Sequence, residues 1–116
     1  MRHGTNLILA CVGDNSCHQE WIRGVPQFDL ILIYYGNNNA VFSDYSKDAL
    51  LCARQQGQKF PLINAFLRRH QLLVSQYDYV WLPDDDVSLA TDDLNCLFTT
   101  AREHQLLICQ TAVAAA

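Results

Sequence analysis

Four short runs of apolar residues set the strongest limit on how this chain can fold. They cover residues 6–12, 28–35, 77–82 and 105–109, and each is rich in aliphatic or aromatic side chains. Within each run the apolar residues follow one another, without the alternation of a half-exposed strand. Continuous runs of this length are typical of strands that are covered on both faces. The runs therefore predict a mostly parallel sheet of about four strands.

The segments between these runs carry signals for helices. Ser16 and Gln19 have the spacing of a capping box that opens a short helix. Pro61 fits the first turn of a second helix, and apolar residues follow it at helical spacing. Thr91 fits the N-cap of a third helix, with acidic residues directly after it.

Strands that alternate with helices predict an α/β domain of three layers, in which helices flank the sheet. Segment 36–57 is the least informative part, because 37–39 is typical of a loop and 43–56 fits either a helix or an irregular segment. No repeat and no linker interrupts the chain. Residues 1–116 are therefore expected to form a single domain.

Composition narrows the function classes. Half of the 116 residues are hydrophobic and 17% are charged, which excludes a disordered chain. Twelve acidic residues against eight basic ones give a net charge of −4, so nucleic acid is not expected as a partner. No apolar run approaches the roughly 20 residues that span a bilayer. The five cysteines are odd in number and include no C-x-x-C pair, which favours a cytoplasmic location.

Small, polar and acidic residues follow three of the predicted strands. Gly13 and Asp14 come after the first run, 36–39 after the second, and 83–86 after the third. In open α/β sheets, ligands bind in the crevice beyond the carboxyl ends of the strands. Turn residues gather at such positions in any α/β protein, so this pattern alone predicts a ligand site only weakly.

The triplet Asp84, Asp85 and Asp86 is the sharpest chemical signal in the chain. Three adjacent carboxylates repel one another, and a divalent cation would offset that repulsion. In an extended segment Asp84 and Asp86 point to the same side. Oxygen ligands favour Mg²⁺ or Mn²⁺, which often bridge to phosphates. The alternative is a solvated acidic turn before a helix, and the triplet alone does not separate the two.

Other motifs fit these residues less well. An EF-hand counted from Asp84 requires Gly and Glu where the chain has Leu89 and Asn95. A phosphohydrolase of the haloacid-dehalogenase type also has Asp-x-Asp after an apolar strand, but it needs a later lysine, and Arg102 is the only basic residue after Asp86. Zinc is not expected, because no second ligand pair lies at finger spacing from Cys17.

Taken together, residues 6–110 resemble glycosyltransferases of the GT-A type, and in particular an uncharacterised glycosyltransferase-like family. The resemblance is carried by 28–36 (FDLILIYYG), 57–62 (GQKFPL), 77–86 (YDYVWLPDDD) and 106–110 (LLICQ). It implies a GT-A or Rossmann-like nucleotide-sugar-binding fold. GT-A enzymes usually carry more chain after the acidic strand, so 1–116 is expected to hold mainly the donor-binding half, truncated at its C-terminus.

The resemblance also implies roles for individual residues. Asp84, Asp85 and Asp86 would be the DxD-type element that holds Mn²⁺ or Mg²⁺, with Asp84 also at the donor diphosphate. Asp14 would lie near the nucleotide base. Lys59 and Asn64 resemble the turn and helix that precede the acidic strand in that group, and Lys59 can contact phosphate.

Two functions remain open from the sequence. The first is a metal-dependent glycosyltransferase that uses a nucleotide-sugar donor and an unknown acceptor. The second is a non-catalytic fragment that binds a nucleotide and a metal. No catalytic residue is predicted. Trp81 is expected in the core, and no role is predicted for His18, His70 or His104.

Overall fold

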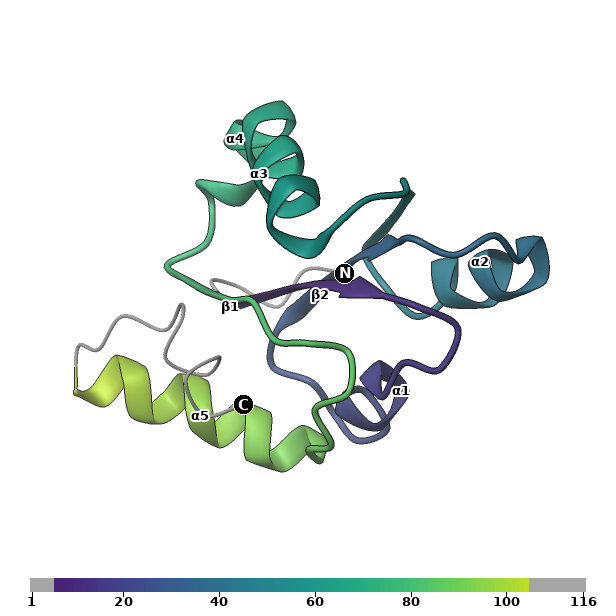
Figure 1. The fold of residues 1–116 in the computed structure, drawn as a ribbon. Helices are drawn as coiled ribbons and strands as arrows, with labels where there is room; N and C mark the ends of the chain where they lie inside the picture. Colours follow the sequence, from purple (N-terminus) through teal and green to yellow (C-terminus); the bar gives the residue numbers. More distant parts are fainter. Residues whose placement is uncertain (1–5, 105–116) are drawn as a thin grey trace.

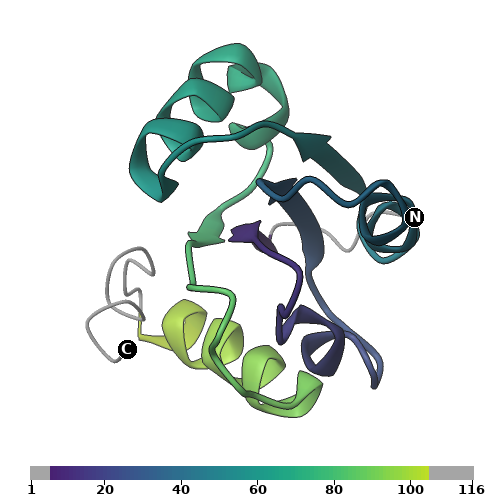
Figure 2. The same ribbon diagram turned by 45° about the vertical axis from the view of Figure 1, so that its right-hand side comes forward.

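The computed structural model of the chain describes residues 6–104, and they form a three-layer α/β domain (Figures 1 and 2). All four strands run parallel, in the order β3-β2-β1-β4. The predicted fold class is confirmed. The elements are β1 (Asn6–Val12), α1 (His18–Trp21), β2 (Asp29–Tyr34), α2 (Asn39–Ser46), β3 (Leu51–Arg54), α3 (Lys59–Arg69), α4 (Gln71–Val74), β4 (Tyr79–Trp81) and α5 (Thr91–Glu103).

Helices cover both faces of the sheet, which explains why the strand sequences do not alternate. Figure 1 shows α3 and α4 on one side of the sheet and α1 and α5 on the other. Along β1, Leu7 and Leu9 pack in the cluster beneath α3, whereas Ile8 and Ala10 pack in the cluster beneath α1 and α5. All four side chains are fully buried, so successive residues of β1 contribute to two different cores.

The strand predictions are confirmed for β1, β2 and β4, and wrong for the segment that contains β3. Residues 51–54 form a strand that pairs with β2, where a helix or an irregular segment was expected. β3 has only four residues, all at least partly exposed, because it lies at the edge of the sheet. The apolar stretch around β3, 49–53 (ALLCA), has none of the β-branched or aromatic residues that mark the other strands. The predicted run 105–109 lies outside the described residues.

Two predicted helix caps are corrected. The N-cap of α1 is Cys17, and the Ser16 hydroxyl accepts a hydrogen bond from the His18 N–H at 3.1 Å. The N-cap of α5 is Ala90, because the Thr91 hydroxyl serves another contact: it donates to the Trp21 carbonyl oxygen at 2.7 Å. The Thr91 side chain thus joins α5 to α1 and does not cap its own helix.

The strand order gives the sheet one switch point, where the direction of chain progression reverses. From β1 the chain moves first to β2 and β3 on one side, and only later to β4 on the other side. The switch point of the sheet therefore lies between β1 and β4, whose register runs from Asn6↔Tyr79 to Ile8↔Trp81. Ligands of open α/β sheets bind beyond the carboxyl ends of the strands at this point.

No helix within residues 6–104 is long and apolar enough to cross a membrane. The four cysteines in that part of the chain, Cys11, Cys17, Cys52 and Cys96, are free thiols.

Candidate functional site at the carboxyl edge of the sheet

The Asp84–Asp85–Asp86 turn follows β4 and lies against the loop that follows β1, at the switch point of the sheet. Asp85 makes the link between the two loops. Its Oδ2 accepts a hydrogen bond from the Gly13 N–H at 2.8 Å, and its carbonyl oxygen accepts one from the Cys17 N–H at 2.6 Å. The side chain and the backbone of Asp85 therefore both hold the loop after β1.

Tyr35, the residue after β2, contacts the same two loops. Its hydroxyl lies 3.5 Å from Asp85 Oδ2. A Cβ atom on residue 13 would come within 2.7 Å of that hydroxyl, so any larger residue there would require the Tyr35 side chain to move. Glycine at position 13 thus leaves room for the Tyr35 side chain beside Asp85.

Asp84 has a different partner. Its Oδ1 lies 2.5 Å from Lys59 Nζ, and that ammonium also donates to the Leu82 carbonyl oxygen at 3.3 Å. The Asp84 side chain is 42% exposed and the Lys59 side chain 20% exposed. The sequence predictions placed these two residues in one site, and the structure brings them into direct contact.

Asp86 is the third member of the triplet and is exposed. Within residues 6–104 it makes no hydrogen bond or ion pair with another side chain. No group of three or more His, Cys, Asp or Glu residues in that range is arranged to hold a metal ion. Asp84 and Asp86 remain as two carboxylates at the rim. Mg²⁺ is commonly held by one or two carboxylates and completes its shell with waters and substrate phosphates, so this donor set fits an open site of that kind.

Two cavities meet at the triplet. The smaller has a volume of about 310 Å³ and lies on the α3 side; it is lined by Cys11, Tyr35, Gly57, Gln58, Lys59, Asp84 and Asp85. The larger has a volume of about 750 Å³ and lies on the α5 side; it is lined by Trp81, Asp84, Asp86, Val87, Ser88, Leu89, Asp93, Cys96, Leu97 and Thr100. Asp84 borders both cavities.

The N-terminus of α3 forms one wall of the smaller cavity. Gly57 turns the chain there with φ of +148°, a backbone conformation that favours glycine. Gln58 is the N-cap but its side chain makes no capping hydrogen bond, and Lys59 is the first helical residue. Helix N-termini attract anions through their free N–H groups and the helix dipole. Burial raises the pKa of the Cys11 thiol to about 11, so this wall residue carries no negative charge at neutral pH.

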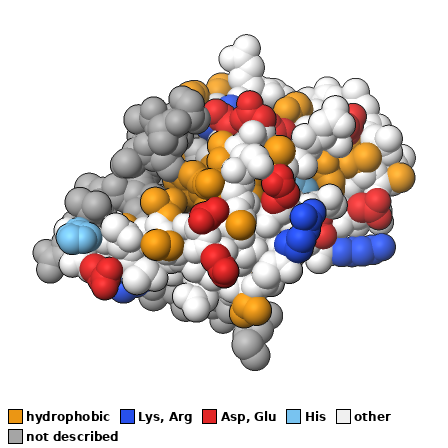
Figure 3. All heavy atoms as spheres, turned by 90° about the horizontal axis from the view of Figure 1, so that it is seen from below, with side chains coloured by type: hydrophobic (Ala, Val, Ile, Leu, Met, Phe, Trp, Pro, Cys, Tyr) orange, Lys and Arg blue, Asp and Glu red, His pale blue; other side chains and the backbone are white. Residues whose placement is uncertain are grey.

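Local positive charge matters here because the surface as a whole is acidic. The net charge is −4, and on the face seen from the side of α1 and α5 acidic side chains are widely spread, whereas the most prominent basic side chains lie at one side (Figure 3). A phosphate ligand would therefore depend on the positive charge within its cavity, and Lys59 supplies it there.

Asp14, the predicted contact to a nucleotide base, lies at the same edge but further along it. Its Oδ1 accepts a 2.5 Å hydrogen bond from the buried Tyr34 hydroxyl, which in turn accepts one from the Asn38 N–H. Burial, together with the bond to Asp14, raises the pKa of the Tyr34 phenol. The Asp14 carboxylate is exposed and held in place by Tyr34.

Asn64 is not brought to this group of residues. It is exposed on α3 and borders a separate depression that Phe60, Pro61, Ile63 and Leu67 also line. No contact within the described residues joins Asn64 to the other predicted site residues, so its role in donor binding stays a prediction.

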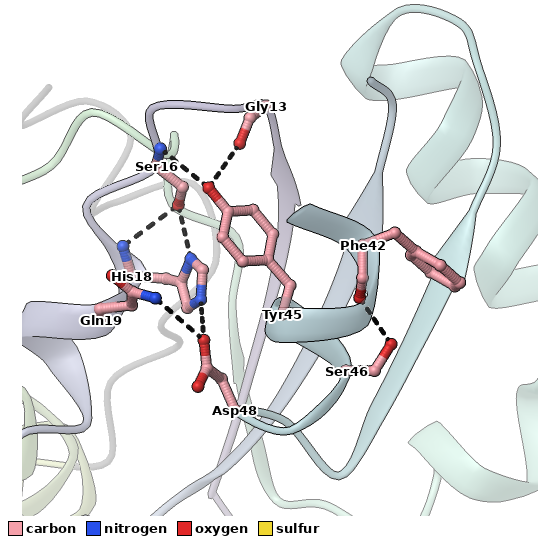
Figure 4. Close-up of polar contacts among 8 residues, drawn as sticks. All are labelled: Gly13, Ser16, His18, Gln19, Phe42, Tyr45, Ser46 and Asp48. Atoms are coloured by element: carbon pink, nitrogen blue, oxygen red, sulfur yellow. Dashed lines mark hydrogen bonds and ion pairs between the residues drawn. The ribbon is translucent and has the colours of Figure 1, made fainter. Parts of the chain in front are cut away.

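The sequence reasoning missed a buried polar network next to this edge (Figure 4). His18 has no exposed surface; its Nε2 lies 2.9 Å from Asp48 Oδ2 and its Nδ1 lies 2.7 Å from Ser16 Oγ. The Tyr45 hydroxyl donates to the Gly13 carbonyl oxygen at 2.9 Å. Burial lowers the pKa of His18, although Asp48 opposes the shift.

This network supports the loop after β1, which Asp85 also holds. The polar atoms of its side chains are engaged in hydrogen bonds within the network or to that loop. His18 and Asp48 are 30 residues apart, so no local sequence signal pairs them. Ser16, His18 and Asp48 resemble a hydrolase triad in residue types only. The nearby N–H groups of Gly13, Cys17 and His18 already donate to Asp85 or Ser16, which leaves them unavailable to an oxyanion.

Comparison with protein-family models, with curated proteins and with solved structures gives no match for this chain.

Proposed function

We propose that the carboxyl edge of the sheet binds a nucleotide-sugar together with Mn²⁺ or Mg²⁺, as in a metal-dependent glycosyltransferase. The observation that carries the proposal is the position of the Asp84–Asp86 turn. It follows β4 at the switch point, and Lys59 lies beside it at the N-terminus of α3. Two of the sequence stretches that carry the resemblance to GT-A glycosyltransferases, 57–62 and 77–86, thus contribute neighbouring side chains to the proposed site.

In this proposal each group has a separate task. Lys59 and the N-terminus of α3 bind the diphosphate from the smaller cavity. Asp84 and Asp86 hold the cation, which would stabilise the charge of a departing diphosphate when bound. Asp14, positioned by Tyr34, accepts a hydrogen bond from the base or the ribose. Asp85 mainly holds the loop after β1, because its Oδ2 accepts from the Gly13 N–H.

A non-catalytic nucleotide-binding and metal-binding domain is the second candidate, and one observation favours it. Among the acidic side chains after Asp86 within residues 6–104, only Asp93 also lines the larger cavity, and its carboxylate is engaged at the start of α5. Asp93 accepts a hydrogen bond from the Ala90 N–H at the start of α5. Glu103 and His104 lie at the other end of that helix, about 15–20 Å away at 1.5 Å per residue.

The phosphohydrolase alternative is less well supported. That chemistry would need a cation from Arg102 near the Asp-x-Asp turn. Arg102 instead donates to Asn6 at 2.7 Å and to Asp78 at 3.3 Å, at the amino ends of β1 and β4. It therefore lies at the opposite edge of the sheet.

We propose a cytoplasmic location on the basis of the cysteines. The free thiols at Cys11, Cys17, Cys52 and Cys96 suit a reducing compartment.

Thermal unfolding with ligands tests the proposed function. A panel of nucleoside diphosphates should raise Tm in the presence of Mn²⁺ and have little effect in chelator, because a ligand that binds only the native state stabilises it. The Asp84→Asn, Asp86→Asn double variant should lose the metal-dependent part of the shift. Asp44→Asn, a change at an exposed carboxylate on α2, is the matched control and should keep it. Equal shifts with and without metal would contradict the proposal.

A further inference from the structure

Lys59 and Asp84 form an ion pair with each other, although the proposed function needs Lys59 for the diphosphate and Asp84 for the cation. Lys59 Nζ lies 2.5 Å from Asp84 Oδ1. Asp84 is also one of the two carboxylates that remain for a divalent cation. A cation on Asp84 therefore competes with the Lys59 ammonium for the same carboxylate.

Both members of the pair can be reached by a ligand without unfolding. Lys59 and Asp84 line the smaller cavity together, and Asp84 also borders the larger one. Lys59 has other favourable contacts as well, since it donates to the Leu82 carbonyl oxygen and lies 5.4 Å from the centre of the Phe60 ring. These contacts hold the ammonium at the cavity wall even when Asp84 is occupied by another cation.

We infer that Lys59 couples cation binding to phosphate binding by exchanging partners. The inference rests on the proposed function and concerns the regulation of the same site. In the free protein Lys59 neutralises Asp84. When a diphosphate enters the smaller cavity, the Lys59 ammonium turns to the phosphate oxygens and Asp84 accepts the cation. Every charge then keeps a partner of opposite sign.

Repulsion should weaken the binding of each ligand alone. A cation alone adds a second positive charge beside Lys59, and a diphosphate alone adds negative charge beside Asp84 and Asp85. When both bind, each offsets the repulsion that the other meets. The coupling is expected at about 10- to 100-fold in affinity, within the range usual for linked sites.

Lys59→Met tests the exchange, because methionine keeps an unbranched apolar side chain and removes the ammonium. Mn²⁺ binding alone is measured from the electron paramagnetic resonance signal of free Mn²⁺. Pyrophosphate binding in excess Mn²⁺ is measured by calorimetry. We expect the variant to bind Mn²⁺ alone about 10-fold more tightly and pyrophosphate with Mn²⁺ about 10-fold more weakly. These two changes have opposite signs.

Lys47→Met is the matched control. Lys47 is 76% exposed and faces Asp44 on α2 at 4.0 Å, away from both cavities. This variant should bind both ligands as the wild type does.

The possible results separate the inference from the proposed function. If Lys59→Met weakens both ligands, or changes neither, the exchange is overturned, whereas cooperative binding by the wild type still supports the proposed function. A wild type that binds neither Mn²⁺ nor Mn²⁺ with pyrophosphate overturns both.

Discussion

Asp85 and Asp86 are neighbours with the same side chain, and the structure predicts opposite consequences for their removal. Asp85→Ala deletes the acceptor of the Gly13 N–H, which is buried in the loop after β1. Asp86→Ala removes an exposed carboxylate. Both variants remove one negative charge from the same turn, so the relief of repulsion is similar in each. The difference between them therefore reports on the hydrogen bond.

The size of that difference follows from the geometry. A hydrogen bond to a charged group contributes about 1.5–3 kcal/mol, and an unsatisfied buried N–H costs about 1–3 kcal/mol. Asp85 is half-buried, which argues for the lower part of the range. We expect Asp85→Ala to lower the free energy of unfolding by about 2 kcal/mol. For a domain of this size that corresponds to a fall in Tm of about 8 °C.

Urea denaturation followed by circular dichroism measures both variants against the wild type. Asp86→Ala should stay within about 0.5 kcal/mol, as is usual for surface changes. Asp85→Asn should recover most of the loss, because its amide oxygen can still accept from the Gly13 N–H. If Asp85→Ala and Asp86→Ala change stability equally, Asp85 does not hold the loop and the assignment of roles within the triplet is wrong.

Three further predictions concern the core, pH and catalysis. Trp81→Ala should cost about 3–5 kcal/mol in urea denaturation, because the ring is 2% exposed and packs against Trp21; a loss below 1 kcal/mol would contradict this. The buried His18 has a lowered pKa, so the unfolded chain binds its proton first as the pH falls. The contribution of His18 to stability should therefore be constant above pH 6.5 and decline below it, and His18→Phe should show less of this decline in a pH series of Tm values. The chain alone should transfer little or no sugar to an acceptor in a product assay, even where it binds donor, because transfer needs an oriented acceptor and a base; robust metal-dependent transfer would refute this.

How much of the fold the sequence predicts depends on how deeply each strand is buried. β1 and β2 have residues packed on both faces, so burial leaves a continuous apolar run that can be read directly. β3 lies in an apolar stretch too, 49–53 (ALLCA), but this stretch has no β-branched or aromatic residue and fits a helix equally well. Its position is set by pairing with β2, where Leu51 lies opposite Ile31. That pairing joins residues 20 positions apart and leaves no pattern in the local sequence.

The same distinction applies to the candidate site. The rule that ligands bind beyond the carboxyl ends of strands predicts its location, because the carboxyl ends of β1, β2 and β4 lie within about one residue of the predicted ends. The partners of each side chain depend on contacts between distant segments. Lys59 lies 25 residues from Asp84, and His18 lies 30 residues from Asp48. No periodicity or spacing encodes these pairs.

The three identical residues of the triplet have different surroundings in the structure. From the sequence, a DxD-type element fits Asp84, Asp85 and Asp86 in more than one register. The carboxylate of Asp85 is directed to the Gly13 N–H and the Tyr35 hydroxyl, where it joins the loops after β1 and β4. Asp84 and Asp86, which precede and follow Asp85 in the sequence, both border the larger cavity. A cation at this edge is therefore expected to use the first and third carboxylates, because the second already has a structural task.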